Sequence, residues 1–284
     1  MRSQNLRSAA VALIAVATLT IAGAASVRAA DAAAAGATPS ASGNLAPAIE
    51  LEPKALGILK GACDKLAASK TMSFKAVVSE ESPSRLGPPL AYYTTSEVLL
   101  ERPDKLRVVS PGDGPRSEFY YDGKTMVAYS PAENMVARAP APATIDAMLE
   151  AAFKAAQIYF PYTDLLVTDP YKGLSDGLRI AFYVGQSDSV GGVKTHIIAY
   201  ANDHAFVQAW IGVDDRMPRR LQAVFRSDPL QLRHSVNLSD WKLGAAVPAG
   251  AFTPPEKSTK ALPIAFGSPQ AMPAGDRSSG AKQQ

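Results

Sequence analysis

The stretch that decides the fold reads FVQAWIGVDDRMPRRLQAVF and spans residues 206–225. In both of its halves, small or apolar residues occupy every second position and alternate with polar or bulkier ones. In the first half, Val207, Ala209, Ile211 and Val213 face one way. In the second half, Leu221, Ala223 and Phe225 share one face. Side chains alternate between the two faces of a strand, and Asp214-Asp215-Arg216 has the composition of a turn. The stretch therefore predicts an antiparallel hairpin with one apolar face.

The same signals recur along the chain and predict about eleven strands in sequential hairpins. The predicted strands are 72–80, 90–100, 105–110, 116–121, 124–130, 134–138, 178–184, 193–201, 206–213, 218–225 and 233–243. Asp122-Gly123 predicts a tight turn in which both residues have positive φ. Because consecutive strands usually pair, we expect one large antiparallel sheet, and a sheet of this size curls.

Two segments show the periodicity of helices. Leu56, Leu59, Cys63 and Leu66 share one face of the first, and Pro53 suits its first turn. The second runs from Thr144, a suitable N-cap, to Tyr159, and Pro161 ends it; residues 164–170 are expected to be irregular. The predicted fold class is therefore α+β: a half-barrel made of one curled antiparallel sheet, with helices packed on its concave face.

The N-terminal segment has the three parts of a secretory signal. Arg2 and Arg7 precede the uncharged run Ser8–Ala25, and Val27-Arg28-Ala29 is a cleavage pattern. A permanent membrane anchor is the alternative, although the run is close to the lower limit for a span. We expect a signal peptide over 1–29, a disordered linker over 30–47, a folded domain over 48–266 and a disordered tail over 267–284.

The charge and the cysteine content limit which partners and which cellular compartment are possible. The chain has 29 basic and 26 acidic residues, and removal of Arg2, Arg7 and Arg28 leaves 26 of each. A neutral mature protein has no overall electrostatic reason to bind nucleic acid. Cys63 is the only cysteine, so an intramolecular disulfide is excluded, and its helical spacing favours a packed apolar side chain over a reactive thiol. No cysteine lies near the cleavage pattern, and the n-region has no twin-arginine pair. We therefore expect a soluble periplasmic protein that is exported unfolded, is not lipidated and is not stably inserted in the membrane.

The sequence offers no convincing catalytic or metal-binding motif. Gly123-Lys124-Thr125 lacks the earlier glycine of a phosphate loop. His196, His204 and His234 form no metal-binding pair, and a GxSxG elbow is missing. Asp214-Asp215 fits a turn better than a catalytic pair. We predict a protein without enzymatic activity or cofactor; a triad assembled from distant residues remains open.

Several short motifs, in their order, resemble a known family. They are 101–107 (ERPDKLR), 121–125 (YDGKT), 191–196 (GGVKTH), 207–211 (VQAWI), 217–220 (MPRR), 239–242 (SDWK) and 252–255 (FTPP). Over roughly residues 50–266 the chain resembles the predicted periplasmic proteins known as DUF2092, which are similar to the lipoprotein carriers LolA and LolB. The resemblance implies an open curled sheet around helices, an apolar cavity and no catalytic residues.

The leading functional hypothesis is a periplasmic carrier or sensor. It would bind a lipid, a lipoprotein acyl chain or another apolar ligand in a cavity between sheet and helices. The residues expected to line this cavity are Ile145, Met148, Leu149, Phe153, Trp210, Leu221 and Phe225. The alternative is a cell-envelope module that binds a protein partner and no ligand, and a hydrolase is the remote alternative.

Overall fold

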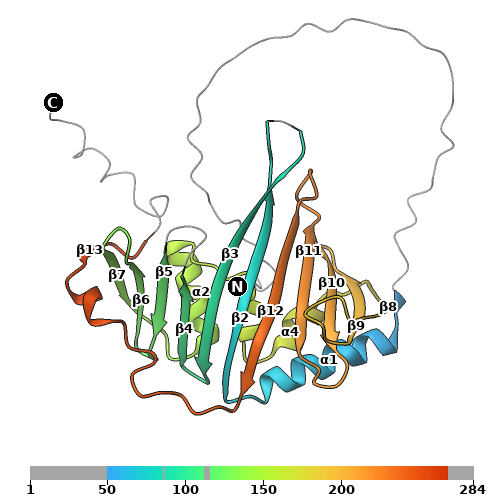
Figure 1. Cartoon of the computed structure of the whole chain (residues 1–284), viewed down its shortest axis with the longest axis horizontal. Coiled ribbons are helices and arrows are strands. Elements are labelled where there is room, and N and C mark those ends of the chain that lie inside the picture. The colour runs from blue at the N-terminus through green and yellow to red at the C-terminus, as the bar shows by residue number, and fades with distance from the viewer. Residues whose placement is uncertain (1–49, 86, 112–115, 268–284) are drawn as a thin grey trace, which may run out of the picture. The chain divides into compact units, whose positions relative to one another are not determined.

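The computed structural model describes residues 50–85, 87–111 and 116–267 (Figure 1). The expected signal peptide, the linker and all but the first residue of the expected tail lie outside the described residues. Within the described part, no helix is long and apolar enough to cross a membrane.

One sheet of 13 strands forms the body of the domain (Figure 1). In chain order its strands are β1 (Glu50–Leu51), β2 (Thr71–Ser82), β3 (Leu90–Glu101), β4 (Lys105–Ser110), β5 (Ser117–Tyr121), β6 (Thr125–Ser130), β7 (Met135–Pro140), β8 (Ile180–Ser187), β9 (Thr195–Ala201), β10 (Ala205–Gly212), β11 (Pro218–Phe225), β12 (Arg233–Leu243) and β13 (Leu262–Ile264). Across the sheet the order is β1-β8-β9-β10-β11-β12-β2-β3-β4-β5-β6-β7-β13. Every strand predicted from the sequence is present, and the predicted fold class, a curled sheet with helices on one face, is confirmed.

The expectation of a purely antiparallel sheet is wrong at both edges. β1 pairs with β8 in parallel, and β13 pairs with β7 in parallel. Both strands are very short and come from segments far from their partners in sequence. At the β1 edge, the Glu50 amide donates to the Arg179 carbonyl (2.9 Å) and the Glu52 amide to the Ala181 carbonyl (2.8 Å). No alternating apolar pattern marks such strands, so the sequence gives no signal for them.

The hairpin of residues 206–225 forms as predicted. Ala209 of β10 lies opposite Leu221 of β11, and Trp210 lies opposite Arg220. β11 continues into β12, and β12 pairs with β2, which joins the two halves of the sheet.

The turn between β5 and β6 differs from the prediction. Gly123 has a φ of +92°, whereas Asp122 is not among the residues with positive φ. The Asp122 carboxylate instead accepts the Lys124 and Thr125 amides (3.0 and 2.8 Å), so side-chain hydrogen bonds shape a three-residue loop. A Cβ at position 123 would lie 2.6 Å from the Asp104 carboxylate, a second reason for glycine there.

Helices cover one face of the sheet. They are α1 (Pro53–Ala67), α2 (Ile145–Ala156), α3 (Thr163–Leu166) and α4 (Pro170–Ser175). A short 3₁₀ helix, η2 (Glu256–Thr259), lies on the other face beside β7, where the Arg138 guanidinium donates to the Ser258 carbonyl (3.3 Å). Thr144 caps α2 as predicted, but α2 ends at Ala156, where the C-cap Gln157 adopts a left-handed conformation, and not at Pro161. The prediction of an irregular segment over 164–170 is wrong, because α3 and the start of α4 lie there. Asp169 caps α4 by accepting the Lys172 amide (3.0 Å).

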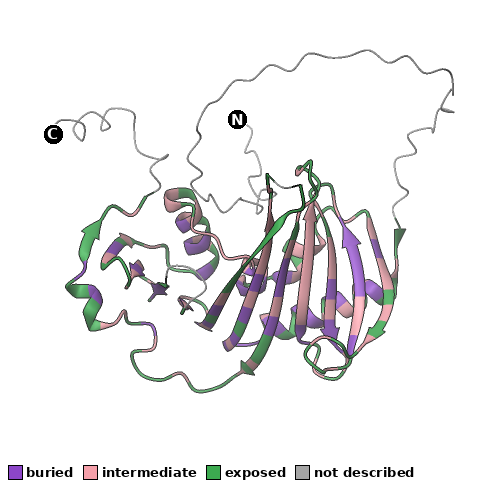
Figure 2. Ribbon diagram, turned by 45° about the horizontal axis from the view of Figure 1, so that its top comes forward, coloured by how far each residue is buried: buried purple, intermediate pink, exposed green. Residues whose placement is uncertain are grey.

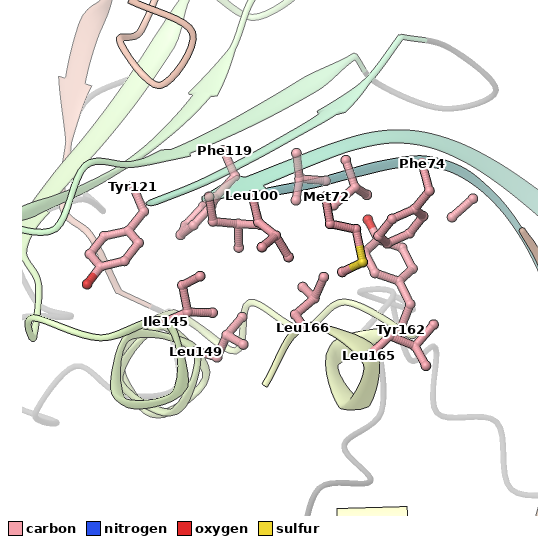
Figure 3. Packing of buried hydrophobic residues seen from close by; sticks show 14 of the residues in the cluster. Met72, Phe74, Leu100, Phe119, Tyr121, Ile145, Leu149, Tyr162, Leu165 and Leu166 are labelled. Atoms are coloured by element: carbon pink, nitrogen blue, oxygen red, sulfur yellow. The ribbon is translucent and has the colours of Figure 1, made fainter. Parts of the chain in front are cut away.

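Two apolar clusters hold the helices to the sheet. The larger joins β2 to β6 with α2 and α3, and Figure 3 shows Ile145 and Leu149 of α2 pointing at Leu100 and Phe119 of the sheet. The smaller joins α1 to β8, β9 and β10 and contains Cys63, which is buried as predicted. Buried and exposed residues alternate along the central strands, which have one covered and one open face (Figure 2). At β5, β6 and β7 the second face is buried as well, in a third cluster of Tyr120, Val127, Tyr129, Val136 and Ala261.

Candidate functional site

The structure divides the residues that the sequence assigns to a ligand cavity. Ile145, Met148 and Leu149 are buried in the larger cluster, so they pack against the sheet side chains. Phe153 is half-buried on the same helix. A role for these four residues in ligand binding would require α2 to move, and it stays a prediction.

Trp210 lies on the opposite face of the sheet from Leu221. Ala209 and Leu221 are directly paired and both contact the smaller cluster under α1. Because neighbouring residues of a strand point to opposite faces, Trp210 points away from the helices. Its ring lies 5.5 Å from the Arg220 guanidinium on that open face. Trp210 therefore cannot line a site on the helix-covered face.

A strip of incompletely covered apolar side chains remains on the concave face. We define the concave strip as Val207, Leu221, Ala223 and Phe225, all half-buried. Val207 lies opposite Ala223, and Leu221 contacts both apolar clusters. Phe225 also packs against the His234 ring, with centroids 5.0 Å apart. Leu221 thus lies where the two clusters meet, and all four side chains of the strip are incompletely covered.

Polar groups occur near one end of the concave strip. We define the mouth group as Glu80, Tyr159, Asp164 and His234. Glu80 of β2 lies directly opposite His234 of β12. The charges of Asp164 and Glu80 both raise the pKa of the Tyr159 phenol, after the larger effect of burial, so its hydroxyl lies within electrostatic reach of both carboxyls.

The carboxyls of the mouth group are poorly solvated. Burial raises the pKa of Asp164. Burial also raises the pKa of Glu80, and the neighbouring His234 partly offsets that effect. No hydrogen bond or ion pair to the Asp164 carboxylate occurs within the described ranges. Asp164 itself is half-buried, as expected for a group in a concave surface that holds little solvent.

Tyr200 and Cys63 lie deeper in the same region. Burial raises the pKa of the Tyr200 phenol, with smaller contributions from Cys63 and Asp164. The Tyr200 hydroxyl is inaccessible and has no hydrogen-bond partner in the described part of the chain. Burial raises the pKa of the Cys63 thiol to about 12. The floor of the region is therefore apolar and contains few satisfied polar groups.

The three histidines lie in different elements of the fold. The His196 ring nitrogen Nδ1 is 3.3 Å from the Tyr183 hydroxyl, His204 is in the turn after β9, and His234 belongs to the mouth group. Among residues 50–85, 87–111 and 116–267, no three His, Cys, Asp or Glu side chains gather in a way that could hold a metal ion.

Sequence reasoning missed Glu80, Tyr159 and Asp164. The sequence predicts an irregular connection around Asp164, and Glu80 is one of two adjacent glutamates at the end of a predicted strand. The alternation of Phe74, Ala76 and Val78 in β2 does place Glu80 on their face. That alternation shows which of the two glutamates points toward the helices, but not which groups its side chain contacts.

Comparison with solved structures finds similar folds at low identity. An uncharacterized conserved protein from Thermus thermophilus is 13% identical, with a TM-score of 0.42, and the alignment covers 75% of this chain and 99% of that one. The lipoprotein LppX from Mycobacterium tuberculosis is 12% identical, with a TM-score of 0.44 and coverage of 69% and 100%. A LolA superfamily protein from Nitrosomonas europaea is 10% identical, with a TM-score of 0.34 and coverage of 70% and 97%. We draw no functional conclusion from likenesses of this extent.

Sequence comparison identifies the family. No curated protein matches the chain. The family model described as "Predicted periplasmic protein (DUF2092)" matches residues 55–266, which include both helix-bearing clusters, the concave strip and the mouth group. The chain therefore belongs to the DUF2092 family of predicted periplasmic proteins.

Proposed function

We propose that this protein is a periplasmic carrier or sensor that binds an amphipathic lipid on the concave face of the sheet. The acyl chain lies along the concave strip, and the polar head lies at the mouth group. The observation that carries the proposal is the position of a partly open apolar strip beside two desolvated carboxyls, Glu80 and Asp164.

The concave strip suits an acyl chain because its side chains are apolar, contiguous and incompletely covered. Val207 of β10 is directly paired with Ala223 of β11. Leu221 and Phe225 lie two residues before and two residues after Ala223, on the same face of β11. Covering such side chains gains roughly 25 cal/mol per Å² of apolar surface removed from water. A flexible chain can follow the strip without a preformed deep cavity.

The mouth group selects the head of the ligand. A desolvated carboxylate without a partner is costly, and a hydroxyl or ammonium donor would satisfy it. Asp164 and Glu80 would repel a carboxylate head placed between them. The proposal therefore favours a neutral or amine-bearing lipid head, such as a glyceride, over a free fatty acid.

A pair of probes with one chain length tests this selection. Protein exported to the periplasm is purified without detergent, its solvent extract is analysed by mass spectrometry, and the lipid-free protein is titrated by calorimetry. The titrants, 1-lauroylglycerol and laurate, are kept below their micelle concentrations at neutral pH. We expect an extracted lipid, and tighter binding of lauroylglycerol than of laurate.

Matched variants locate the site on the sheet. Phe225→Ala removes a half-buried aromatic ring from the concave strip, and Trp210→Ala removes one from the opposite face. Only Phe225→Ala should weaken the binding of lauroylglycerol. Equal effects of both variants, or the absence of both an extracted lipid and probe binding, would overturn the proposal.

A second candidate function, the binding of an envelope protein, is supported by a different observation. Leu90, Tyr92 and Leu230 are 48%, 58% and 59% exposed. They lie at the projecting ends of the β2–β3 and β11–β12 hairpins (Figure 1). Exposed apolar side chains on projecting hairpin ends suit an interaction surface. A photo-crosslinker at position 92 should then capture one envelope protein, which a crosslinker at exposed Lys75 of the same hairpin should not capture.

A further inference from the structure

The open face of the sheet carries a polar hollow that the proposed lipid site does not use. Its volume is 430 Å³, and four neighbouring strands, β3, β2, β12 and β11, form it. Val78 and Val236 are buried beneath the helices, so the alternate residues Ser79 and Ser235 point into the hollow from the opposite face.

The strand register explains why the sheet is hollowed at this place. Tyr93, Ser79, Ser235 and Gln222 occupy consecutive positions in one row across the four strands. The two small serines in the middle of the row form the floor. The larger Tyr93 and Gln222 stand at its ends, and Tyr93 is 55% exposed. The hollow thus combines an accessible aromatic ring with hydroxyl and amide groups.

Two arginines give the hollow a positive charge. Arg220 lines it, and Nη2 of its guanidinium contacts the Gln222 side-chain oxygen (3.1 Å) and the Ser235 hydroxyl (3.5 Å). No carboxylate pairs with Arg220 among the described residues. Arg233 lies 3.8 Å from the Glu81 carboxylate, which also accepts the Arg233 backbone amide (2.9 Å). Glu81 therefore offsets Arg233, and the charge of Arg220 remains in excess.

Arg220 is also held in place. Its Nε is inaccessible to solvent and has no hydrogen-bond partner within the described ranges, and its guanidinium lies 5.5 Å from the Trp210 ring. A guanidinium that is fixed, partly desolvated and without a counter-charge favours an oxyanion, which it can bind through two parallel hydrogen bonds.

We propose that the hollow binds one acidic saccharide unit, a sugar ring that carries a carboxylate or a phosphate. The anion pairs with Arg220, the sugar hydroxyls bond to Ser79, Ser235 and Gln222, and the ring packs on Tyr93. A volume of 430 Å³ is within the usual range for a small-molecule site, roughly 300–1,000 Å³.

The test is a titration of the full chain, followed by NMR, with four probes: glucuronate, glucose 6-phosphate, glucose and inorganic phosphate. We expect binding of at least one acidic sugar that is clearly tighter than the binding of either glucose or phosphate alone. Preference for glucuronate or for glucose 6-phosphate identifies the anion. Equal affinity for glucose and the acidic sugars, no binding of either acidic sugar, or equal affinity for phosphate alone would overturn the proposal.

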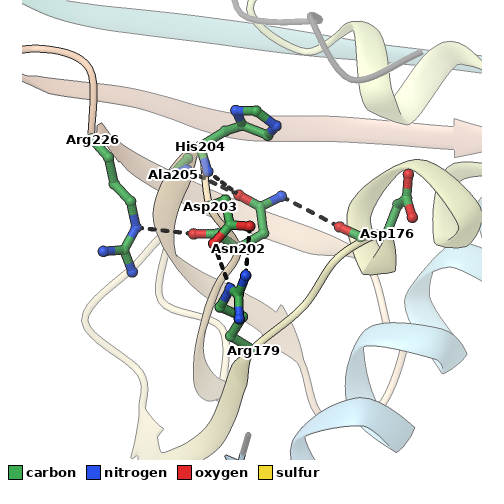
Figure 4. A network of polar contacts seen from close by, with 7 residues as sticks. All are labelled: Asp176, Arg179, Asn202, Asp203, His204, Ala205 and Arg226. Atoms are coloured by element: carbon green, nitrogen blue, oxygen red, sulfur yellow. Dashed lines mark hydrogen bonds and ion pairs between the residues drawn. The ribbon is translucent and has the colours of Figure 1, made fainter. Parts of the chain in front are cut away.

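Variants assign the contacts. Arg220→Gln should weaken the binding of the acidic sugar roughly tenfold or more, since it removes a charge-assisted hydrogen bond. Arg226→Gln is the matched control, because Arg226 lies outside the hollow and its Nε donates to the Asn202 carbonyl (2.9 Å, Figure 4). Tyr93→Ala alters an exposed side chain, so it should leave the fold intact. It should weaken the binding of the sugars more than the binding of phosphate. Full affinity in Arg220→Gln or in Tyr93→Ala would count against the assignment.

Discussion

Truncation of Leu221 to alanine separates the contribution of this side chain to folding from its contribution to ligand binding. The change removes three carbons, whose complete burial is worth about 2.4 kcal/mol at ~0.8 kcal/mol per CH₂. Leu221 is half-buried where the two apolar clusters meet. Since no more than about a third of this side chain is exposed, most of that free energy, at least ~1.5 kcal/mol, should be lost from the free energy of unfolding of the lipid-free protein.

The remainder becomes available only when an acyl chain covers the side chain. Its loss, at most ~0.9 kcal/mol, should raise the Kd for 1-lauroylglycerol by up to about fourfold, since each factor of ten corresponds to about 1.4 kcal/mol. Urea unfolding of the lipid-free protein measures the first quantity, and calorimetric titration at a fixed temperature measures the second.

Two results would refute this reasoning. Parental affinity for lauroylglycerol in Leu221→Ala would show that no chain covers the strip. A loss of unfolding free energy as large as that expected for a fully buried leucine would show that the position is already closed in the free protein. Trp210→Ala, on the opposite face of the sheet, is the control for general effects on the protein.

Three further predictions concern stability and reactivity. Leu100 is completely buried, so Leu100→Ala should lower the free energy of unfolding by roughly 2–5 kcal/mol in urea titrations; a much smaller loss would mean that the larger cluster is loosely packed. Burial raises the pKa of Asp164 above its ordinary value of 3.8, so ionisation of this carboxyl destabilises the fold. The free energy of unfolding should therefore fall as the pH rises from 3.8 through the raised pKa. Asp164→Asn should therefore raise the Tm at pH 7, and the gain should disappear on acidification below 3.8; a gain independent of pH would contradict this. The Cys63 thiol, whose pKa burial raises to about 12, should react with Ellman's reagent only after denaturation, and rapid labelling of the native protein would contradict its burial.

The parts of the fold that depend on local pattern are predictable from the sequence. Alternation predicts each central strand, and Leu59, Cys63 and Leu66 predict α1, because one face of each element must be buried. The parallel edge strands β1 and β13 are two and three residues long, so their pairing depends on distant partners that no local pattern reveals.

The candidate site is less predictable for a related reason. Alternation places Trp210 and Ala209 on opposite faces of β10, but only the register between β10 and β11 shows that Leu221 shares its face with Ala209. The mouth group joins residues from β2, α3 and β12 with Tyr159, which follows α2. Tertiary packing brings these segments together, and no spacing within the sequence encodes their proximity.

The pairing of β2 with β12 has a consequence for how the chain matures. The antiparallel run from β2 to β7 is formed by neighbouring segments and can assemble as soon as residues 71–140 are available. The helix α1 precedes all of them, yet it packs on β8, β9 and β10, and the β2–β12 seam closes only when residues 233–243 arrive. Contacts between such distant segments slow folding. When the chain emerges from its N-terminus, the apolar face of α1 and the edge of β2 stay uncovered until the last third of the domain is available. In that interval they are the surfaces that a folding chaperone would shield.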